Sequence, residues 1–211
     1  MKNDTVAPAT IALHADREFE LLHGIAPPIA QSVTYYADDD ADFARQSEQP
    51  LNDRFYARHG DPTSSRIAKA IADLEGGEAA MMFGSGMGAI TTAVLAHVSA
   101  GDHVVAQTNH YIGTTNLMTH LLPRYGVKVT RVDQSSADAF REAIQPNTRL
   151  IVVETPVNPT MQLTDLAAVA SLAKSRGIAT LCDNTFATPL NQRPFDFGID
   201  AIAHCDRSFR H

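Results

Sequence analysis

Residues 150–159 read LIVVETPVNP, an apolar run of strand length that ends in a carboxylate and continues into two prolines. An apolar run without polar alternation indicates a strand that is buried on both faces, as in parallel sheets covered by helices. Proline restricts the backbone and interrupts a strand, so a constrained turn should follow Glu154. This stretch therefore favours an α/β fold built on a mostly parallel sheet.

Similar apolar runs alternate with helical patterns on both sides of that stretch. This alternation predicts a mostly parallel sheet with helices on both faces. In such sheets ligands bind at the carboxyl ends of the strands, so candidate site residues should follow the strands. The expected strands are Ala79–Phe83, His103–Gln107, Val127–Val132, Leu150–Glu154, Ala179–Asp183 and Asp200–His204, and the expected helices are Ser64–Leu74, Gly88–Val98, Thr114–Arg124, Ala137–Ile144 and Leu166–Arg176.

The beginning of the chain differs from the rest because it lacks strong periodicity. It contains the turn-forming sequence Ala26-Pro27-Pro28 and an acidic run, Asp38–Asp42. We expect residues 1–62 to form an extended arm, with a short helix near its start, that contacts a neighbouring subunit. Residues 63–204 should then form the α/β domain, and residues 205–211 a divergent tail.

The composition excludes several classes of protein. The 211 residues are 44% hydrophobic and 19% charged, which is ordinary for a globular protein, and the net charge of −7 argues against nucleic acid as a partner. Cys182 and Cys205 show no metal-binding spacing and suit a reducing compartment. The sequence has neither a signal-peptide pattern nor an apolar run near about 20 residues. We expect a cytoplasmic protein that binds no metal, nucleic acid or membrane.

The sequence Gly84–Ala89, GSGMGA, follows the first expected strand and opens a helix. Small residues at a helix N-terminus let backbone N–H groups approach an anion, so the stretch is a candidate phosphate site; the alternative is a tight turn that needs glycine for its geometry. The pattern also fits a dinucleotide fingerprint, which needs an acidic residue at the end of the next strand. That strand ends in Gln107, which disfavours a nicotinamide cofactor.

Aromatic and polar residues follow the other strands. Tyr111 could stack on a flat ring or merely cover the sheet edge, and Asn158 is held between two prolines, in a loop that could equally be only rigid. Asp183 ends a buried strand, where a carboxylate needs a partner such as the protonated nitrogen of pyridoxal phosphate (PLP), unless it caps a helix. Tyr56 and Arg58 share one side of an extended arm, and arginine suits phosphate, although both could simply be solvated.

The order and spacing of these motifs resemble the Cys/Met-metabolism PLP enzymes, which include cystathionine γ-synthase, cystathionine β- and γ-lyases, sulfhydrylases and methionine γ-lyase. The resemblance covers roughly residues 10–204. It implies the large-domain fold of aspartate aminotransferase, PLP as cofactor, and β/γ-elimination or γ-replacement on cystathionine or an activated homoserine. The motifs that carry it are YARHGDPT at 56–63, LEGG at 74–77, SGM at 85–87, Tyr111, ETPVNP at 154–159 and DNT at 183–185.

The resemblance also implies individual roles. Tyr111 would stack on the cofactor ring and assist proton transfer, Asp183 would pair with the ring nitrogen, and Asn158 would contact the side of the ring that carries the 3-oxygen. Tyr56 and Arg58 would reach the phosphate of a neighbouring subunit in a homodimer or homotetramer. The residues implied to bind the cofactor are Tyr56, Arg58, Ser85, Gly86, Met87, Tyr111, Asn158, Asp183 and Thr185.

The sequence departs from the family pattern at three places. Asp61 replaces an asparagine, and Gly113 stands where methionine γ-lyases carry cysteine, which disfavours that subtype. The family continues its last strand with His-Ser-x-Thr-Lys, whereas residues 204–208 read HCDRS and place Ser208 at the lysine position. Serine cannot form the Schiff base, so we expect a truncated form without full activity. Alternatives are a non-catalytic fragment that binds PLP or other subunits and, less favoured, an NAD-dependent oxidoreductase.

Overall fold

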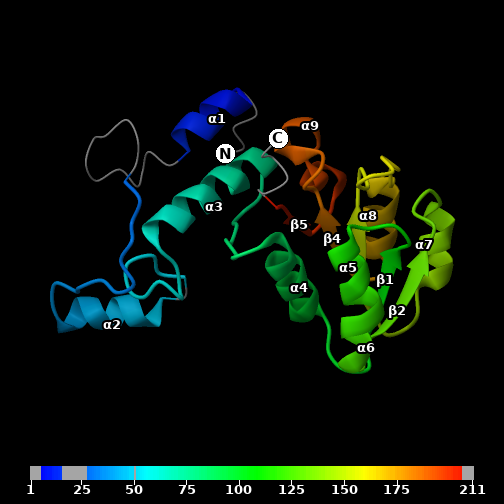
Figure 1. The fold of residues 1–211 in the computed structure, drawn as a ribbon, viewed down its shortest axis with the longest axis horizontal. Coiled ribbons are helices and arrows are strands. Elements are labelled where there is room, and N and C mark those ends of the chain that lie inside the picture. Colours follow the sequence, from blue (N-terminus) through cyan, green and yellow to red (C-terminus); the bar gives the residue numbers. More distant parts are fainter. Residues whose placement is uncertain (1–5, 16–27, 50, 206–211) are drawn as a thin grey trace. The chain divides into compact units, whose positions relative to one another are not determined.

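The computed structural model describes residues 6–15, 28–49 and 51–205. It divides the chain into two compact units, residues 1–82 and residues 83–211 (Figure 1). The second unit contains the sheet and most of the predicted site residues.

The second unit is built on a parallel sheet of five strands in the order β2-β1-β3-β4-β5. This confirms the predicted α/β class, and apart from small differences at their ends these strands lie where the apolar runs predicted them. The strands are β1 (His103–Gln107), β2 (Lys128–Val132), β3 (Thr148–Glu154), β4 (Ala179–Asp183) and β5 (Ala201–Ala203).

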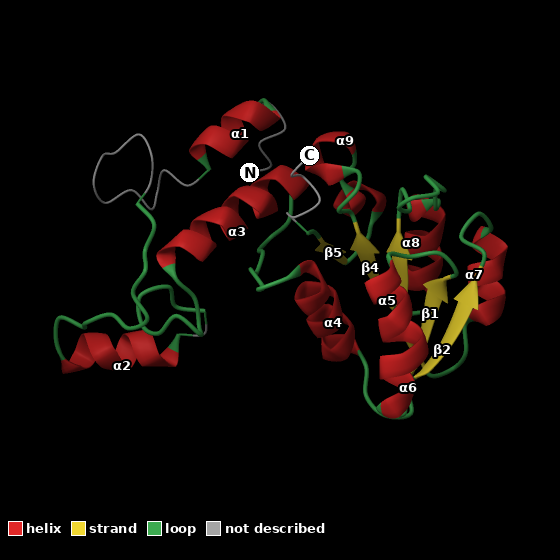
Figure 2. Cartoon of the chain, in the orientation of Figure 1, coloured by secondary structure: helices red, strands yellow, loops and turns green. Residues whose placement is uncertain are grey.

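Helices cover both faces of this sheet (Figure 2). Alternate strand residues point to opposite faces, so Val104 packs in one apolar cluster and Val105 in the other. No helix among the described residues is long and apolar enough to span a membrane. One face carries α4 (Gly86–His97), α5 (Ile112–Asn116), a π-helical turn (Leu117–Leu121) and α6 (Leu122–Arg124). The other face carries α7 (Ala137–Ala143) and α8 (Leu166–Ser175). Before β5 come α9 (Thr188–Asn191) and a 3-10 turn (Pro194–Phe197).

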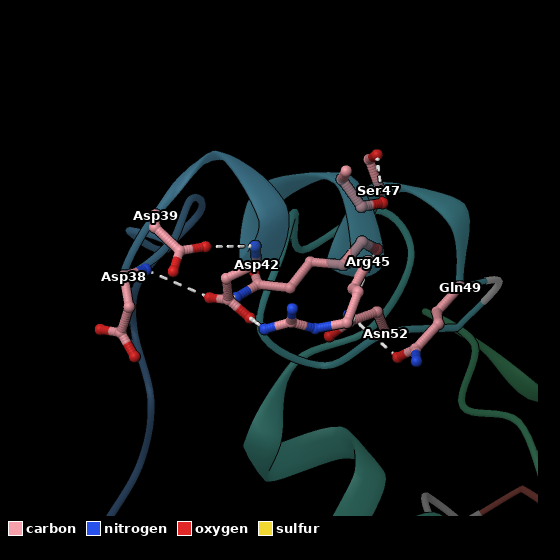
Figure 3. A network of polar contacts seen from close by, with 9 residues as sticks. Asp38, Asp39, Asp42, Arg45, Ser47, Gln49 and Asn52 are labelled. Carbon is pink, nitrogen blue, oxygen red and sulfur yellow. Dashed lines mark hydrogen bonds and ion pairs between the residues drawn. The ribbon is translucent and has the colours of Figure 1, made fainter.

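The first unit contains α1 (Pro8–His14), α2 (Asp40–Glu48) and α3 (Pro62–Glu75). The acidic run, expected in an extended segment, instead begins α2, where the Asp39 carboxylate accepts a hydrogen bond from the Asp42 amide at 2.7 Å (Figure 3). The Asp42 carboxylate in turn pairs with Arg45 at 2.9 Å. Acidic side chains stabilise the N-terminal turn of a helix, which explains why this run is helical.

Two further expectations were wrong. Ala79–Phe83 forms no strand, and Met81 and Met82 in it are exposed. Apolar character alone does not make a strand, which also needs a neighbour for its backbone hydrogen bonds. The helix expected to begin at Ser64 begins at Pro62, because the Asp61 carboxylate caps it by accepting from the amides of Thr63 and Ser64, both at 3.0 Å.

Candidate functional site

The carboxyl ends of the parallel strands meet at one edge of the sheet. The last residues of β3 and β4, Glu154 and Asp183, are paired in register, and Asp183 is paired with Ala203 of β5. Tyr111 follows β1, and Asn158 follows β3. The topology thus gathers these side chains at the edge where parallel α/β sheets bind ligands.

The GSGMGA stretch forms the N-terminal turn of α4 beside the end of β5. The Ser85 hydroxyl accepts a hydrogen bond from the Gly88 amide at 3.0 Å and caps the helix. A Cβ atom on Gly86 would lie 2.6 Å from the Cβ of Cys205, so only glycine fits there. The amides of Gly86 and Met87 belong to the first turn, where backbone N–H groups have no acceptor within a helix and favour an anion.

Tyr111 lies next to this turn. A Cβ atom on Gly113 would approach both the Met87 sulfur, at 2.7 Å, and the Cε1 atom of Tyr111, at 2.8 Å. The Thr114 hydroxyl also donates to the Met87 sulfur at 3.8 Å. The Tyr111 residue remains 47% exposed. An accessible aromatic side chain therefore lies beside a turn suited to phosphate.

Glu154 connects two loops of the site. One carboxylate oxygen accepts the Tyr111 amide N–H at 2.6 Å, and the other accepts the Asn158 amide N–H at 3.1 Å. Burial raises the pKa of Glu154, the two amide bonds lower it, and the nearby Asp183 raises it further. No sequence motif assigned a role to Glu154, although its place at the end of a strand, as at Asp183, was an available signal.

Gln107 braces the same region from the end of β1. Its side-chain amide donates to the carbonyls of Asn109, at 2.6 Å, and Glu154, at 2.8 Å. Its side-chain oxygen accepts the Glu154 amide at 3.0 Å and the Thr164 hydroxyl at 3.1 Å. These bonds use both ends of the Gln107 amide within the protein. The position at which a dinucleotide fold would hold a ribose is therefore occupied by a structural bridge.

Asp183 is a buried carboxylate at the mouth of the sheet, 7% exposed. Burial raises its pKa, whereas hydrogen bonds from Thr185, including an amide bond at 3.0 Å, and the nearby His204 lower it. Asp183 does not cap a following helix, because α9 begins only at Thr188. A cationic group at this position, such as a protonated ring nitrogen, would compensate the buried charge, so the site fits the ring of PLP.

The remaining predicted residues lie elsewhere. Thr185 accepts the Cys205 amide at 2.9 Å and so ties the end of β4 to the end of β5. Tyr56 and Arg58 belong to the first unit, where the Arg58 guanidinium lies 5.2 Å from the centre of the Tyr56 ring. Ser208, at the expected lysine position, lies outside the described residues. The structure thus brings together the predicted residues of the second unit and, separately, the pair in the first.

Comparisons with known proteins identify the family of the chain. A family model described as "Cys/Met metabolism PLP-dependent enzyme" matches residues 9–208. L-methionine gamma-lyase of Porphyromonas gingivalis is 40% identical over 197 residues, which are 93% of this chain and 49% of that protein. Cystathionine beta-lyase of Bacillus subtilis is 40% identical over 185 residues, which are 88% of this chain and 45% of that protein. The chain spans about half the length of the curated relatives it matches.

Solved structures extend the likeness to the fold. The crystal structure of a putative O-acetylhomoserine (thiol)-lyase from Campylobacter jejuni, which contains N'-pyridoxyl-lysine-5'-monophosphate, superposes with a TM-score of 0.90 at 31% identity. That match covers 95% of this chain and 49% of the other. A protein from Corynebacterium glutamicum matches with a TM-score of 0.86 at 33% identity, covering 95% of this chain and 50% of the other.

Proposed function

The chain belongs to the Cys/Met metabolism family of PLP-dependent enzymes, and from this membership we propose that its second unit binds PLP at the carboxyl edge of the sheet. The observation that carries the proposal is the buried Asp183 carboxylate in the unit that also holds a glycine-lined helix N-terminus and an accessible tyrosine. When bound, PLP supplies an electron sink for reactions at the carbon atoms of an amino acid.

Each part of the site has a distinct task in this proposal. The amides of Gly86 and Met87, with Ser85, bind the phosphate through the α4 N-terminus. Asp183 holds the proton on the ring nitrogen, and Thr185 keeps the Asp183 carboxylate oriented. Tyr111 places its ring against the pyridine and is the candidate for moving protons. The Asn158 amide contacts the 3-oxygen side of the ring.

We further propose an oligomer in which residues 1–62 act as an inter-subunit arm. Arg58 suits this role because a guanidinium offers several hydrogen-bond donors to a phosphate oxygen. Tyr56 and Arg58 already contact each other, so one arm would present both to a neighbouring phosphate. Dimers or tetramers in the cytoplasm are the expected state.

The parent reaction that we propose is β/γ-elimination or γ-replacement on cystathionine or an activated homoserine. The names of the relatives, which include cystathionine lyases, a probable cystathionine gamma-synthase and methionine gamma-lyases, support this class. Ser208 has no amine to hold the cofactor covalently, so we propose that this chain binds PLP without efficient turnover. A non-catalytic role in binding PLP or other subunits is the second candidate, favoured by the same residue.

Equilibrium dialysis of the full chain against PLP, inorganic phosphate and NAD tests the proposal. We expect PLP to bind and NAD not to bind. Asp183→Ala should weaken PLP binding by at least about tenfold, because a charge-assisted bond to the ring nitrogen is lost. The matched control is Asp196→Ala, which removes an exposed carboxylate from the same unit. Wild-type chain that binds no PLP, or equal affinities for both variants, would contradict the proposal.

A further inference from the structure

Glu154 is buried, yet among the described residues its carboxylate makes no hydrogen bond to a side chain of the proposed cofactor site. Both of its oxygens accept backbone amides instead, from Tyr111 at 2.6 Å and from Asn158 at 3.1 Å. These two residues belong to different loops, one after β1 and one after β3. A single carboxylate therefore joins the two loops that carry the proposed ring contacts.

The main chain of Glu154 is itself held by neighbouring strands of the sheet. The Gln107 side chain accepts from the Glu154 amide at 3.0 Å and donates to the Glu154 carbonyl at 2.8 Å. Backbone pairing with Asp183 of β4 fixes its other side. Since the main chain of Glu154 is held by both neighbouring strands, its carboxylate is a rigid reference point for the loops. Bonds from an ionised acceptor are also stronger than those between neutral groups.

We propose that Glu154 is a positioning residue for the cofactor ring, which holds Tyr111 and Asn158 in one mutual geometry. The inference rests on the proposed PLP function and deepens it. Glu154 acts through these two backbones, and none of its hydrogen bonds among the described residues reaches the phosphate turn of α4. Loss of its carboxylate should therefore affect the recognition of the ring and spare the recognition of phosphate.

Glu154→Gln is the decisive variant because it keeps the size of the side chain. It replaces one of the two acceptor oxygens by an NH₂ donor, so either the Tyr111 or the Asn158 amide must lose its acceptor. We expect the dissociation constants for PLP and for pyridoxal to rise about tenfold, as for the loss of one hydrogen bond to a charged group. The constant for inorganic phosphate should stay within about twofold, because helix-terminus binding of an anion is independent of Glu154. The circular dichroism of bound PLP should weaken.

A double-mutant cycle with Tyr111→Ala tests whether Glu154 works through its proposed partner. If it does, the two substitutions should be non-additive for PLP binding, because the second removes a ring contact that the first has already displaced. Glu142→Gln, on an exposed position of α7, controls for the loss of one negative charge and should behave as wild type.

The outcomes separate this inference from the proposed function. Failure of the wild-type chain to bind PLP would remove both. PLP binding that Glu154→Gln leaves unchanged would overturn the inference and leave the function intact. Equal weakening of PLP and phosphate would make Glu154 merely structural, which also overturns it. If Glu154→Gln does not fold, amide hydrogen exchange of the wild-type chain decides: the Tyr111 and Asn158 amides should both be protected, and free exchange of either one overturns the inference.

Discussion

The two ends of the central sheet bury polar groups in opposite ways. At the amino end of the strands, His103 is fully buried in β1, and its two ring nitrogens lie 2.8 Å from the hydroxyls of Thr148 and Thr130 on the flanking strands. At the carboxyl end, Glu154 and Asp183 bring two carboxylates into neighbouring buried positions.

The difference shows in the pKa values of these groups. Burial, with a smaller effect of Lys128, lowers the pKa of His103, so that its neutral form suits the two hydroxyl partners. Burial raises the pKa of Glu154 and Asp183, whose charged forms are therefore held at a cost. Buried groups whose pKa values are shifted, and which a bound ligand could neutralise, are typical of active sites. Under the proposed function, the amino end serves stability, and the carboxyl end gives up stability for the binding of PLP.

His103→Ala should have the largest effect on stability. It leaves a cavity among three strands and deprives the Thr130 and Thr148 hydroxyls of a partner, which should lower the free energy of unfolding by about 3 kcal/mol. Urea denaturation measures the change, and His97→Ala, at an exposed position of α4, is the control. PLP affinity in the folded variant should stay near that of wild type. A loss below about 1 kcal/mol would remove the contrast between the two ends.

The next effect is that of acid on the free energy of unfolding, through a buried histidine at the carboxyl end of the strands. Burial, assisted by the charge of Arg131 and opposed by the Val152 carbonyl, lowers the pKa of His110 to about 4. The unfolded chain protonates His110 below pH about 6.5, whereas the folded chain does so only below about 4. The stability linked to neutral His110 is therefore fully present above pH about 6.5 and is lost as the pH falls from there through about 4. The loss amounts to about 3 kcal/mol.

His110→Gln isolates this contribution. Glu154 and Asp183 act in the opposite direction, because stability linked to a raised carboxyl pKa is present at low pH and is lost as the pH rises. Urea denaturation of the wild-type chain and of His110→Gln along a pH series measures the contribution. The free energy of unfolding should fall less steeply with acid in the variant, because it lacks the buried imidazole. Parallel curves would mean that His110 is protonated equally in the folded and unfolded states.

Asp183→Asn should give a smaller effect of opposite sign. Removing a buried charge should raise the free energy of unfolding by about 1 kcal/mol at neutral pH, while the asparagine oxygen still accepts the Thr185 amide. The gain should shrink in acid, where Asp183 is protonated. Thermal denaturation measures it, with the exposed Asp196→Asn as control, and PLP affinity should fall in the same variant. Destabilisation at neutral pH would contradict the idea that the carboxyl end gives up stability.

Tyr111→Ala should change stability least. Tyr111 is half-exposed, and its backbone amide can still donate to Glu154, so the free energy of unfolding should change by no more than about 0.5 kcal/mol. PLP binding should nevertheless weaken through the lost ring contact. A destabilisation above about 2 kcal/mol would mean that Tyr111, like His103, serves mainly to stabilise the fold.

The sequence predicted the sheet well because its strands are buried on both faces and read as continuous apolar runs. Ala79–Phe83 is similarly apolar, but it lacks the β-branched residues of the other runs and pairs with no strand among the described residues. The cap at Asp61 was missed because Ser64, an equally good capping residue, follows three positions later. Tyr111, Asn158 and Asp183 could be predicted as candidate site residues because they lie at or after the end of a strand. Glu154 and Gln107 could not be assigned roles, since their bonds depend on the alignment of β1 with β3.

The order of the strands shows which segments the Glu154 carboxylate connects through its bonds to the Tyr111 and Asn158 amides. From β1 the chain passes over one face of the sheet to β2, at one side, whereas from β3 it passes over the other face to β4, at the opposite side. The winding direction therefore reverses between β1 and β3, and the segments that leave these strands diverge. Such a topological switch point opens a crevice in any doubly wound sheet, whatever its sequence. Glu154 spans this point, so one side chain holds together two segments that the topology separates.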